Sequence, residues 1–239
     1  MSPLGHSTWT QSTGRRPPNL LLFDLDGTLS DPLEGISRCL NFALTNHGYP
    51  PRTPSDLTQY IGPPLDRAFS ALVGTTDTRE IGSLVAKYRE RYAEVGFSEN
   101  VLYPGIPQML AHLSEAGVPM AVCTSKRADF ADKILQMFSL LDHFRFVDGG
   151  DTGIEKWQQI AALRDKGMVG SASLMIGDRA VDVAAARRNG MEAGGVLWGY
   201  GSRTELESEA PRYLFHSPAE IVSMIGAEIA SADEAGRPS

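Results

Sequence analysis

The sequence predicts an α/β protein in which a parallel β-sheet core carries an all-helical domain inserted after the first strand. Two observations support this fold class. Short apolar runs alternate with helical hydrophobic patterns over most of the chain, and such alternation is typical of βαβ units in a parallel sheet. One segment, residues 32–103, interrupts the alternation, because it contains helical patterns and no convincing strand.

The expected strands and helices of the core follow in order along the chain. The strands are residues 20–23, 118–123, 144–147, 174–176, 195–197 and, as a weaker sixth, 213–215. The helices are residues 105–116, 128–138, 155–166 and 180–189. The last helix has a clear end, because Asn189-Gly190 follows two arginines and is a stop signal. The core is therefore expected to comprise residues 19–31 and 104–228.

The inserted domain, residues 32–103, contains three helical patterns punctuated by prolines. These patterns cover residues 32–46, 65–73 and 78–96. Residues 1–18 are rich in Ser, Thr, Gly and Pro and lack the apolar core of a signal peptide. We expect this segment and residues 229–239 to be mobile tails.

The composition of the chain indicates which classes of binding partner and which cellular compartment to expect. The 239 residues are 42% hydrophobic and 21% charged, and the net charge of -7 argues against a nucleic-acid groove. The sequence has no stretch that approaches the roughly 20 apolar residues of a membrane span. Cys39 and Cys123 are far apart and form no Cys-x-x-Cys motif, which suits a reducing compartment. We expect a cytoplasmic protein that binds neither nucleic acid nor membranes.

The end of the first strand carries the most informative residues. The apolar run is followed by Asp24, Asp26 and then Gly27-Thr28. Residues i and i+2 of an extended strand point to the same side, so the two carboxylates can converge where the strand ends. Gly27 allows a sharp turn with exposed backbone N–H groups. Carboxylates attract a cation and N–H groups attract an anion, so the segment predicts a site for phosphate and Mg²⁺.

This segment resembles the Asp-x-Asp-Gly-Thr signature of phosphatases among the haloacid-dehalogenase-like hydrolases. The resemblance implies a Rossmann-like core in which Asp24 is the nucleophile and Asp26 is the general acid/base. It also implies that residues 32–103 form the cap, a domain that closes over the active site and selects the substrate. Asp26 disfavours a dehalogenase or a phosphonate hydrolase, whereas sugar phosphomutases carry both Asp residues.

The end of the strand at residues 118–123 resembles the second motif of this family. Thr124 and Ser125 follow the strand, and their hydroxyls can bind phosphate oxygens. The resemblance implies that they do so together with the backbone N–H groups near Gly27. Helix capping is the alternative role for such hydroxyls.

A lysine near a helix start corresponds to the third motif. Lys156 is the candidate, and the resemblance implies that it neutralises phosphate charge and holds the nucleophile in place. Trp157 follows it, where many relatives have proline. Lys126 is the alternative candidate for this role.

Gly177, Asp178 and Asp182 resemble the fourth motif of the family. Asp182 is four residues after Asp178. Asp178 falls at a strand end, where a carboxylate can complete an oxygen shell for Mg²⁺. Asp182 falls in the first turn of a helix, where it can bind the metal, hydrogen-bond the motif lysine or cap the helix. The implied ligands of Mg²⁺ are Asp24, Asp26 through its backbone carbonyl, Asp178 and Asp182.

Within the family, the chain looks most like the phosphoglycolate-phosphatase-like subgroup. The likeness is carried by residues 176–179, 189–190 and 195–202. Residues 61–65 match a cap segment that is expected to face the active site. Arg38 and Arg67 are candidates for binding a second charge on the substrate, with a surface position as the alternative.

We therefore predict a Mg²⁺-dependent phosphatase that hydrolyses a small phosphate monoester such as phosphoglycolate through an aspartyl-phosphate. The alternatives are a 5'-nucleotidase-type phosphatase and a sugar phosphomutase of the same superfamily. A phosphoacceptor signalling domain would be much shorter and lack the insert, and a catalytically silent scaffold would be expected to lack a motif residue. The expected partner is a small-molecule phosphate ester, and the protein is expected to be a monomer or weak dimer.

Overall fold

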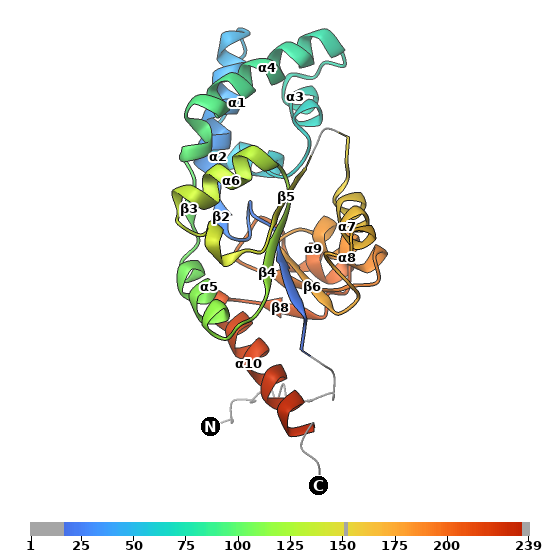
Figure 1. Ribbon diagram of the computed structural model, residues 1–239. Helices are drawn as coiled ribbons and strands as arrows, with labels where there is room; N and C mark the ends of the chain where they lie inside the picture. Colours follow the sequence, from blue (N-terminus) through green and yellow to red (C-terminus); the bar gives the residue numbers. More distant parts are fainter. Residues whose placement is uncertain (1–16, 151–152, 236–239) are drawn as a thin grey trace, which may run out of the picture.

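A six-stranded parallel sheet forms the centre of the molecule (Figure 1). The computed structural model describes residues 17–150 and 153–235. The strand order is β5-β4-β1-β6-β7-β8. The strands are β1 (Leu20–Phe23), β4 (Met120–Arg127), β5 (Val147–Gly150), β6 (Ser173–Gly177), β7 (Glu192–Val196) and β8 (Tyr213–Phe215). The predicted fold class is confirmed.

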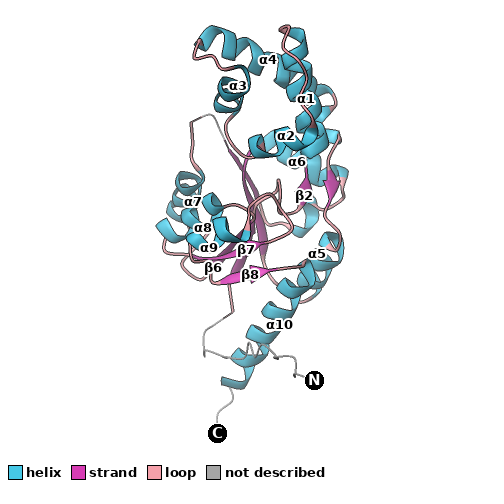
Figure 2. Ribbon diagram, turned by 180° about the vertical axis from the view of Figure 1, so that it is seen from behind, coloured by secondary structure: helices cyan, strands magenta, loops and turns pink. Residues whose placement is uncertain are grey.

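Helices cover both faces of this sheet (Figure 2). The helices of the core are α5 (Ile106–Glu115), α6 (Ala128–Met137), η3 (Leu141–His143), α7 (Lys156–Asp165), α8 (Ala180–Arg188), α9 (Arg203–Ser208) and α10 (Pro218–Ala235). Along β1, Leu21 and Phe23 pack in one hydrophobic cluster with α5, α6 and α10. Leu20 and Leu22 pack in a second cluster with α7, α8 and α9. Burial on both faces explains why this strand is a continuous apolar run in the sequence.

The inserted segment forms a helical cap beyond the carboxyl edge of the sheet (Figure 1). Its helices are α1 (Leu33–Asn46), α2 (Pro54–Leu57), η1 (Thr58–Tyr60), α3 (Leu65–Val73), α4 (Thr78–Glu94) and η2 (Gly96–Ser98). They surround a hydrophobic cluster of their own that includes Leu40, Phe69 and Leu84. Phe130 of the core helix α6 belongs to the same cluster, so the cap packs directly on the core.

A short antiparallel ribbon joins the cap to the core. Its strands are β2 (Ser30–Asp31) and β3 (Val101–Leu102), and Ser30 pairs with Leu102. The expectation that the insert contains no strand is wrong at this point. A strand of two residues is too short to show a hydrophobic period, so no pattern in the sequence indicates it. The ribbon places both connections of the cap next to the turn that follows β1.

Two strands of the core begin away from their predicted positions. β5 begins at Val147, where the expected strand ends, and β7 begins at Glu192, earlier than expected. Both strands contain two consecutive glycines. Glycine adds no apolar side chain, so the hydrophobic pattern of the sequence does not indicate a strand at these positions. At Gly194 of β7 a Cβ would lie 2.6 Å from the ring of Phe215, so the neighbouring side chain requires a glycine here.

The C-terminal helix continues past the predicted end of the core at residue 228. α10 extends to Ala235, and Ile229 packs against the core cluster. This corrects the predicted tail 229–239, of which residues 236–239 lie outside the described part. Residues 1–16 also lie outside it, so most of the N-terminal tail stays a prediction. Among the described helices, none is both long and apolar enough to cross a membrane.

Candidate active site

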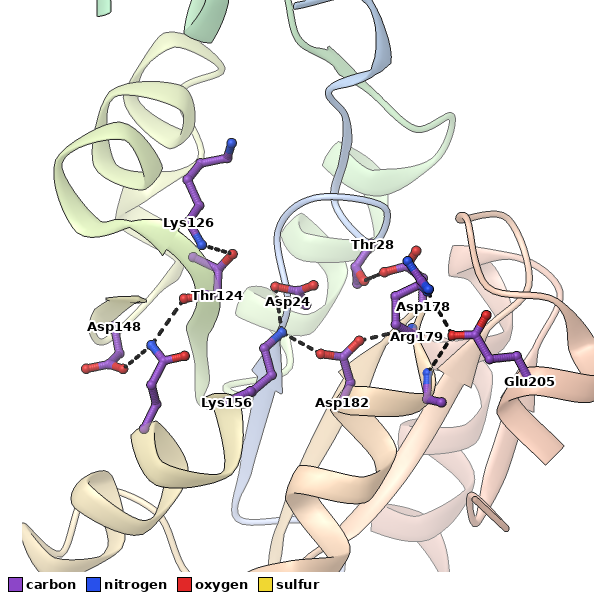
Figure 3. A network of polar contacts seen from close by, with 12 residues as sticks. Asp24, Thr28, Thr124, Lys126, Asp148, Lys156, Asp178, Arg179, Asp182 and Glu205 are labelled. Carbon is purple, nitrogen blue, oxygen red and sulfur yellow. Dashed lines mark hydrogen bonds and ion pairs between the residues drawn. The ribbon is translucent and has the colours of Figure 1, made fainter. Parts of the chain in front are cut away.

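The candidate residues meet at the carboxyl edge of the sheet (Figure 3). β1 lies between β4 and β6, and Phe23 aligns with a residue of each strand. Asp24 directly follows β1, Asp178 directly follows β6, and Thr124 lies within β4, so the three residues become neighbours at this edge. Ligands of open parallel sheets bind at this edge.

The turn after β1 depends on Gly27. Its φ of +87° lies in the left-handed region, which glycine adopts without strain. A Cβ here would lie 2.2 Å from Oδ2 of Asp178, so glycine also makes room for that carboxylate. The N–H of Gly27 donates to the carbonyl of Ser30 at 2.8 Å. The Gly27 amide therefore has a partner within the turn, and its predicted contact with phosphate stays a prediction.

Three buried carboxylates form a candidate metal site. Asp24, Asp178 and Asp182 each offer one oxygen, and these oxygens lie within 4.8 Å of one another. The N–H of Tyr200 donates to Oδ2 of Asp178 at 2.8 Å and fixes its orientation. A Cβ on Gly199 would lie 2.6 Å from the same oxygen, so glycine keeps the space around it open. Oxygen donors and the room left beside them fit Mg²⁺.

Burial and like charge together raise the pKa of Asp178 to about 8. Burial is the larger cause, and the negative charges of Asp182 and Asp24 add to it. A divalent cation would offset both effects, because it stabilises the ionised carboxylates. The acidic cluster is thus poised to exchange a proton for a metal ion.

We expect the metal-free protein to lose stability as the pH rises from about 4 to about 8. A carboxyl with a raised folded-state pKa takes up a proton on folding, so its contribution is full below the unfolded value of 3.8 and is lost as the pH rises through about 8. Thermal unfolding in EDTA should give a lower Tm near pH 8 than near pH 6, and excess Mg²⁺ should reduce the difference. The variant Asp178→Asn should show a smaller pH dependence; an unchanged dependence would contradict the assignment.

Two buried lysines contact different carboxylates. The Nζ atom of Lys156, the first residue of α7, lies 2.9 Å from Oδ1 of Asp24 and also binds Asp182. The Nζ atom of Lys126 lies 2.8 Å from Oδ2 of Asp26. Burial alone would lower the pKa of each lysine, but the neighbouring acidic groups raise it, so both stay charged. The two candidates for the motif lysine therefore have separate partners.

Two hydroxyl residues of β4 differ in position, and the strand continues to Arg127, past its predicted end at residue 123. Thr124 is 1% exposed, and its Oγ1 accepts a hydrogen bond from the N–H of Lys126 at 3.2 Å. Thr124 lies on β4 on the side of Asp24 (Figure 3). Ser125 is exposed, at a point where the register between β4 and β5 shifts. Thr124 is thus placed at the site, whereas Ser125 faces solvent.

The tryptophan in place of the usual proline does not displace the motif lysine. The ring of Trp157 lies 4.4 Å from the guanidinium carbon of Arg188, and its Nε1 donates to Glu155 at 2.5 Å. The ring is half-buried and packs against the second hydrophobic cluster of the core. Lys156 keeps its position at the start of the helix and remains buried.

The cap reaches the site at two points. The carbonyl of Ile61, in the expected segment 61–65, accepts a hydrogen bond from Arg179 at 3.1 Å. Tyr92 of α4 accepts a hydrogen bond on its hydroxyl from Nζ of Lys126 at 2.6 Å. The contact of Tyr92 had no signal in the sequence, because an aromatic residue in an amphipathic helix is also expected in the cap's own core.

The two arginines proposed for a second substrate charge are placed elsewhere. Arg38 pairs with Glu34 and, at 2.6 Å, with Glu99, and its side chain is half exposed. Arg67 is exposed on the cap. The contacts of Arg38 are therefore internal to the cap, and they neutralise its charge.

The sequence comparisons decide the family. Residues 21–196 match the family model for haloacid dehalogenase-like hydrolases. The chain belongs to this family. It is 40% identical over 202 residues to a 5'-nucleotidase of Pseudomonas aeruginosa, a match that covers 83% of this chain and 90% of that protein. It is 31% identical over 210 residues to a phosphoglycolate phosphatase of Aquifex aeolicus, which covers 86% of this chain and 96% of that protein.

A solved structure supports the same assignment. A predicted phosphatase from Clostridium acetobutylicum superimposes with a TM-score of 0.81 at 31% identity, over 88% of this chain and 99% of that chain. The haloacid dehalogenase-like fold thus accounts for the parallel sheet and for the helical cap after its first strand. The chain is a phosphatase of this family, in the phosphoglycolate-phosphatase-like subgroup.

Proposed function

We propose that this haloacid dehalogenase-like phosphatase hydrolyses a small phosphate monoester in the presence of Mg²⁺ through an aspartyl-phosphate. The observation that carries the proposal is that the carboxylates of Asp24 and Asp26 have different surroundings. Asp24 is buried and held by Lys156. Asp26 has one oxygen paired with Lys126 and a second, buried oxygen with no hydrogen-bond partner.

Asp24 is the proposed nucleophile. Its carboxylate attacks phosphorus, the new bond between aspartate oxygen and phosphorus forms, and the bond to the ester oxygen breaks. Lys156 orients the carboxylate through a contact of 2.9 Å. Its positive charge also lowers the cost of bringing an anionic ester to an anionic nucleophile. Thr124 of the neighbouring strand β4 is proposed to bind a non-bridging phosphate oxygen.

Asp26 is the proposed general acid and base. Burial raises its pKa above the ordinary value, partly offset by Lys126, which favours a carboxyl that can carry a proton to the leaving alcohol. After the alcohol leaves, the same carboxylate accepts a proton from water as that water attacks the aspartyl-phosphate. The free Oδ1 atom is available for both transfers.

The acidic cluster is the proposed metal site. Asp24, Asp178 and Asp182 would hold Mg²⁺ together with the backbone carbonyl of Asp26. The bound cation would supply electrostatic stabilisation of the charge on the transferring phosphoryl group. Asp182 also binds Lys156, so it links the metal site to the lysine that holds the nucleophile.

For the substrate, we rank a nucleoside 5'-monophosphate ahead of phosphoglycolate. The higher identity to the P. aeruginosa 5'-nucleotidase supports this order. The charge of Arg38 also supports it, because Glu34 and Glu99 already pair with this arginine. Phosphoglycolate carries a carboxylate that needs a cation in the site, whereas a nucleoside does not.

A substrate panel tests the proposed function. We expect Mg²⁺-dependent phosphate release, abolished by EDTA, when nucleoside monophosphates, phosphoglycolate, sugar phosphates and pyrophosphate are compared. A true substrate should exceed the others by about a hundredfold in kcat/KM, roughly 2.7 kcal/mol of differential transition-state binding. Isomerised sugar phosphate in place of free phosphate would favour the mutase alternative. Release that is unaffected by EDTA would contradict the metal proposal.

A further inference from the structure

Lys126 lies between the catalytic turn and the cap. Its side chain is only 8% exposed. The Nζ atom is 2.8 Å from Oδ2 of Asp26 on one side and 2.6 Å from the hydroxyl of Tyr92 on the other. Asp26 follows the first strand of the core, and Tyr92 belongs to helix α4 of the cap. One ammonium group thus connects the proposed general acid to the cap.

A β-bulge places this lysine. In the pairing of β4 with β5, Thr124 aligns with Gly149, and the next aligned pair is Arg127 with Gly150. Residues 125–126 are therefore extra on β4, and such a bulge redirects side chains next to active sites. The hydrogen bond from the Lys126 N–H to Oγ1 of Thr124 holds the bulge. The lysine is consequently held by the backbone as well as by its ammonium contacts.

Tyr92 is a well-fixed partner for it. The tyrosine is 4% exposed, and its ring stacks on Tyr88 with centroids 5.6 Å apart. It also meets the ring of Phe130 edge to face at 4.9 Å. Since Phe130 belongs to the core helix α6, this aromatic contact holds the cap and core together around the lysine.

We propose that Lys126 is a positioning residue that couples the cap to the general acid. It engages Oδ2 of Asp26 from the cap side and so leaves Oδ1 free for the leaving group. The proposal rests on the proposed acid role of Asp26. Lys126 acts through Asp26 and makes no contact with Asp24, whose lysine partner is Lys156.

This role predicts a loss that depends on the leaving group. A positioned acid contributes about 10²–10⁴-fold to proton transfer, and it matters most when the departing oxygen is strongly basic. Benzyl phosphate and p-nitrophenyl phosphate are a matched pair, because they are similar in size but leave as a basic alkoxide and a weakly basic phenolate. A merely structural lysine would affect both esters equally.

The test measures kcat/KM for both esters with the metal present. We expect Lys126→Met to lower the value for benzyl phosphate at least about tenfold more than the value for p-nitrophenyl phosphate. Lys133→Met is the matched control, because this substitution removes the same charge from an exposed lysine of α6. The Nζ atom of Lys133 lies 5.4 Å from the ring centroids of Phe97 and Phe130. The control should leave the ratio of the two values unchanged. An equal loss on both esters in Lys126→Met overturns the proposal.

A second variant tests the link to the cap. Tyr92→Phe keeps the aromatic ring and removes only the hydroxyl that Lys126 contacts. We expect a smaller shift of the ratio in the same direction, and no further shift when it is combined with Lys126→Met, because both act through one contact. An unchanged ratio in Tyr92→Phe overturns the coupling to the cap. Thermal unfolding checks that each variant is folded.

Asp26→Asn separates this proposal from the proposed function. If this variant loses activity selectively on benzyl phosphate and Lys126→Met does not, the acid role stands and the positioning role fails. If Asp26→Asn itself lowers both esters equally, the acid role fails, and the positioning role fails with it.

Discussion

Replacing Asp24 with Asn is expected to lower kcat by at least about 10⁴-fold while the fold is retained. The amide has nearly the shape of the carboxylate but is a very poor nucleophile, and removal of a catalytic nucleophile typically costs this much or more. The change also removes one of three mutually repelling carboxylates, so the fold should not suffer from added charge. Steady-state phosphate release and thermal unfolding measure the two effects separately.

The covalent intermediate gives a second readout for this variant. Rapid acid quench of the wild-type enzyme during turnover should leave a phosphate adduct on the peptide that contains Asp24, and Asp24→Asn should show none. Asp148→Asn is the matched control, because Asp148 is a partly buried carboxyl on β5 that contacts Gln159 at 3.2 Å. It should retain near-wild-type activity. Activity of Asp24→Asn within tenfold of wild type, with deamidation excluded by mass, would rule out the nucleophile.

The features that the sequence predicted well are local. Asp24 and Thr124 directly follow apolar runs and Asp178 follows one after a single glycine, so these three residues could be assigned to the site from a few neighbouring letters. The topology then made them neighbours, because ligands of a parallel sheet gather at one edge. Gly27 was predicted as a turn residue. The hydrogen bond from its N–H to the carbonyl of Ser30 could not be predicted, because it depends on the conformation of the whole turn.

The features that the sequence did not reveal depend on pairs of residues far apart in the chain. The contact between Tyr92 and Lys126 joins a cap helix to a core strand, and neither residue has a local signal for it. Lys126 and Lys156 were both candidates for the motif lysine. The structure distinguishes them, because Lys126 lies in the bulge after Thr124 and Lys156 begins α7. For Arg38, the pairing with Glu34 four residues earlier on α1 is local, but the pairing with Glu99 at 2.6 Å joins distant parts of the chain and had no signal in the sequence.

Replacing Lys156 with Met is expected to destabilise the metal-free protein by about 3–5 kcal/mol, because it breaks a buried ion pair and leaves its partners uncompensated. Lys156 is 3% exposed and contacts both Asp24 and Asp182. Without its charge, these two carboxylates and Asp178 form a buried cluster with no lysine to balance it. Urea unfolding in EDTA measures the loss, and an unchanged m-value shows that the unfolded state is comparable.

The matched control separates burial from pairing. Lys87 lies 2.9 Å from Glu90, the same separation as between Lys156 and Asp24, but the side chains of Lys87 and Glu90 are 31% and 57% exposed. Lys87→Met should cost about 0–1 kcal/mol. The excess loss in Lys156→Met should shrink at low pH, where the carboxylates bind protons, and Mg²⁺ should stabilise this variant more than wild type. A loss as small as that of the control would show that the acidic cluster does not depend on the lysine, and Lys156 could then not be what holds Asp24 for attack.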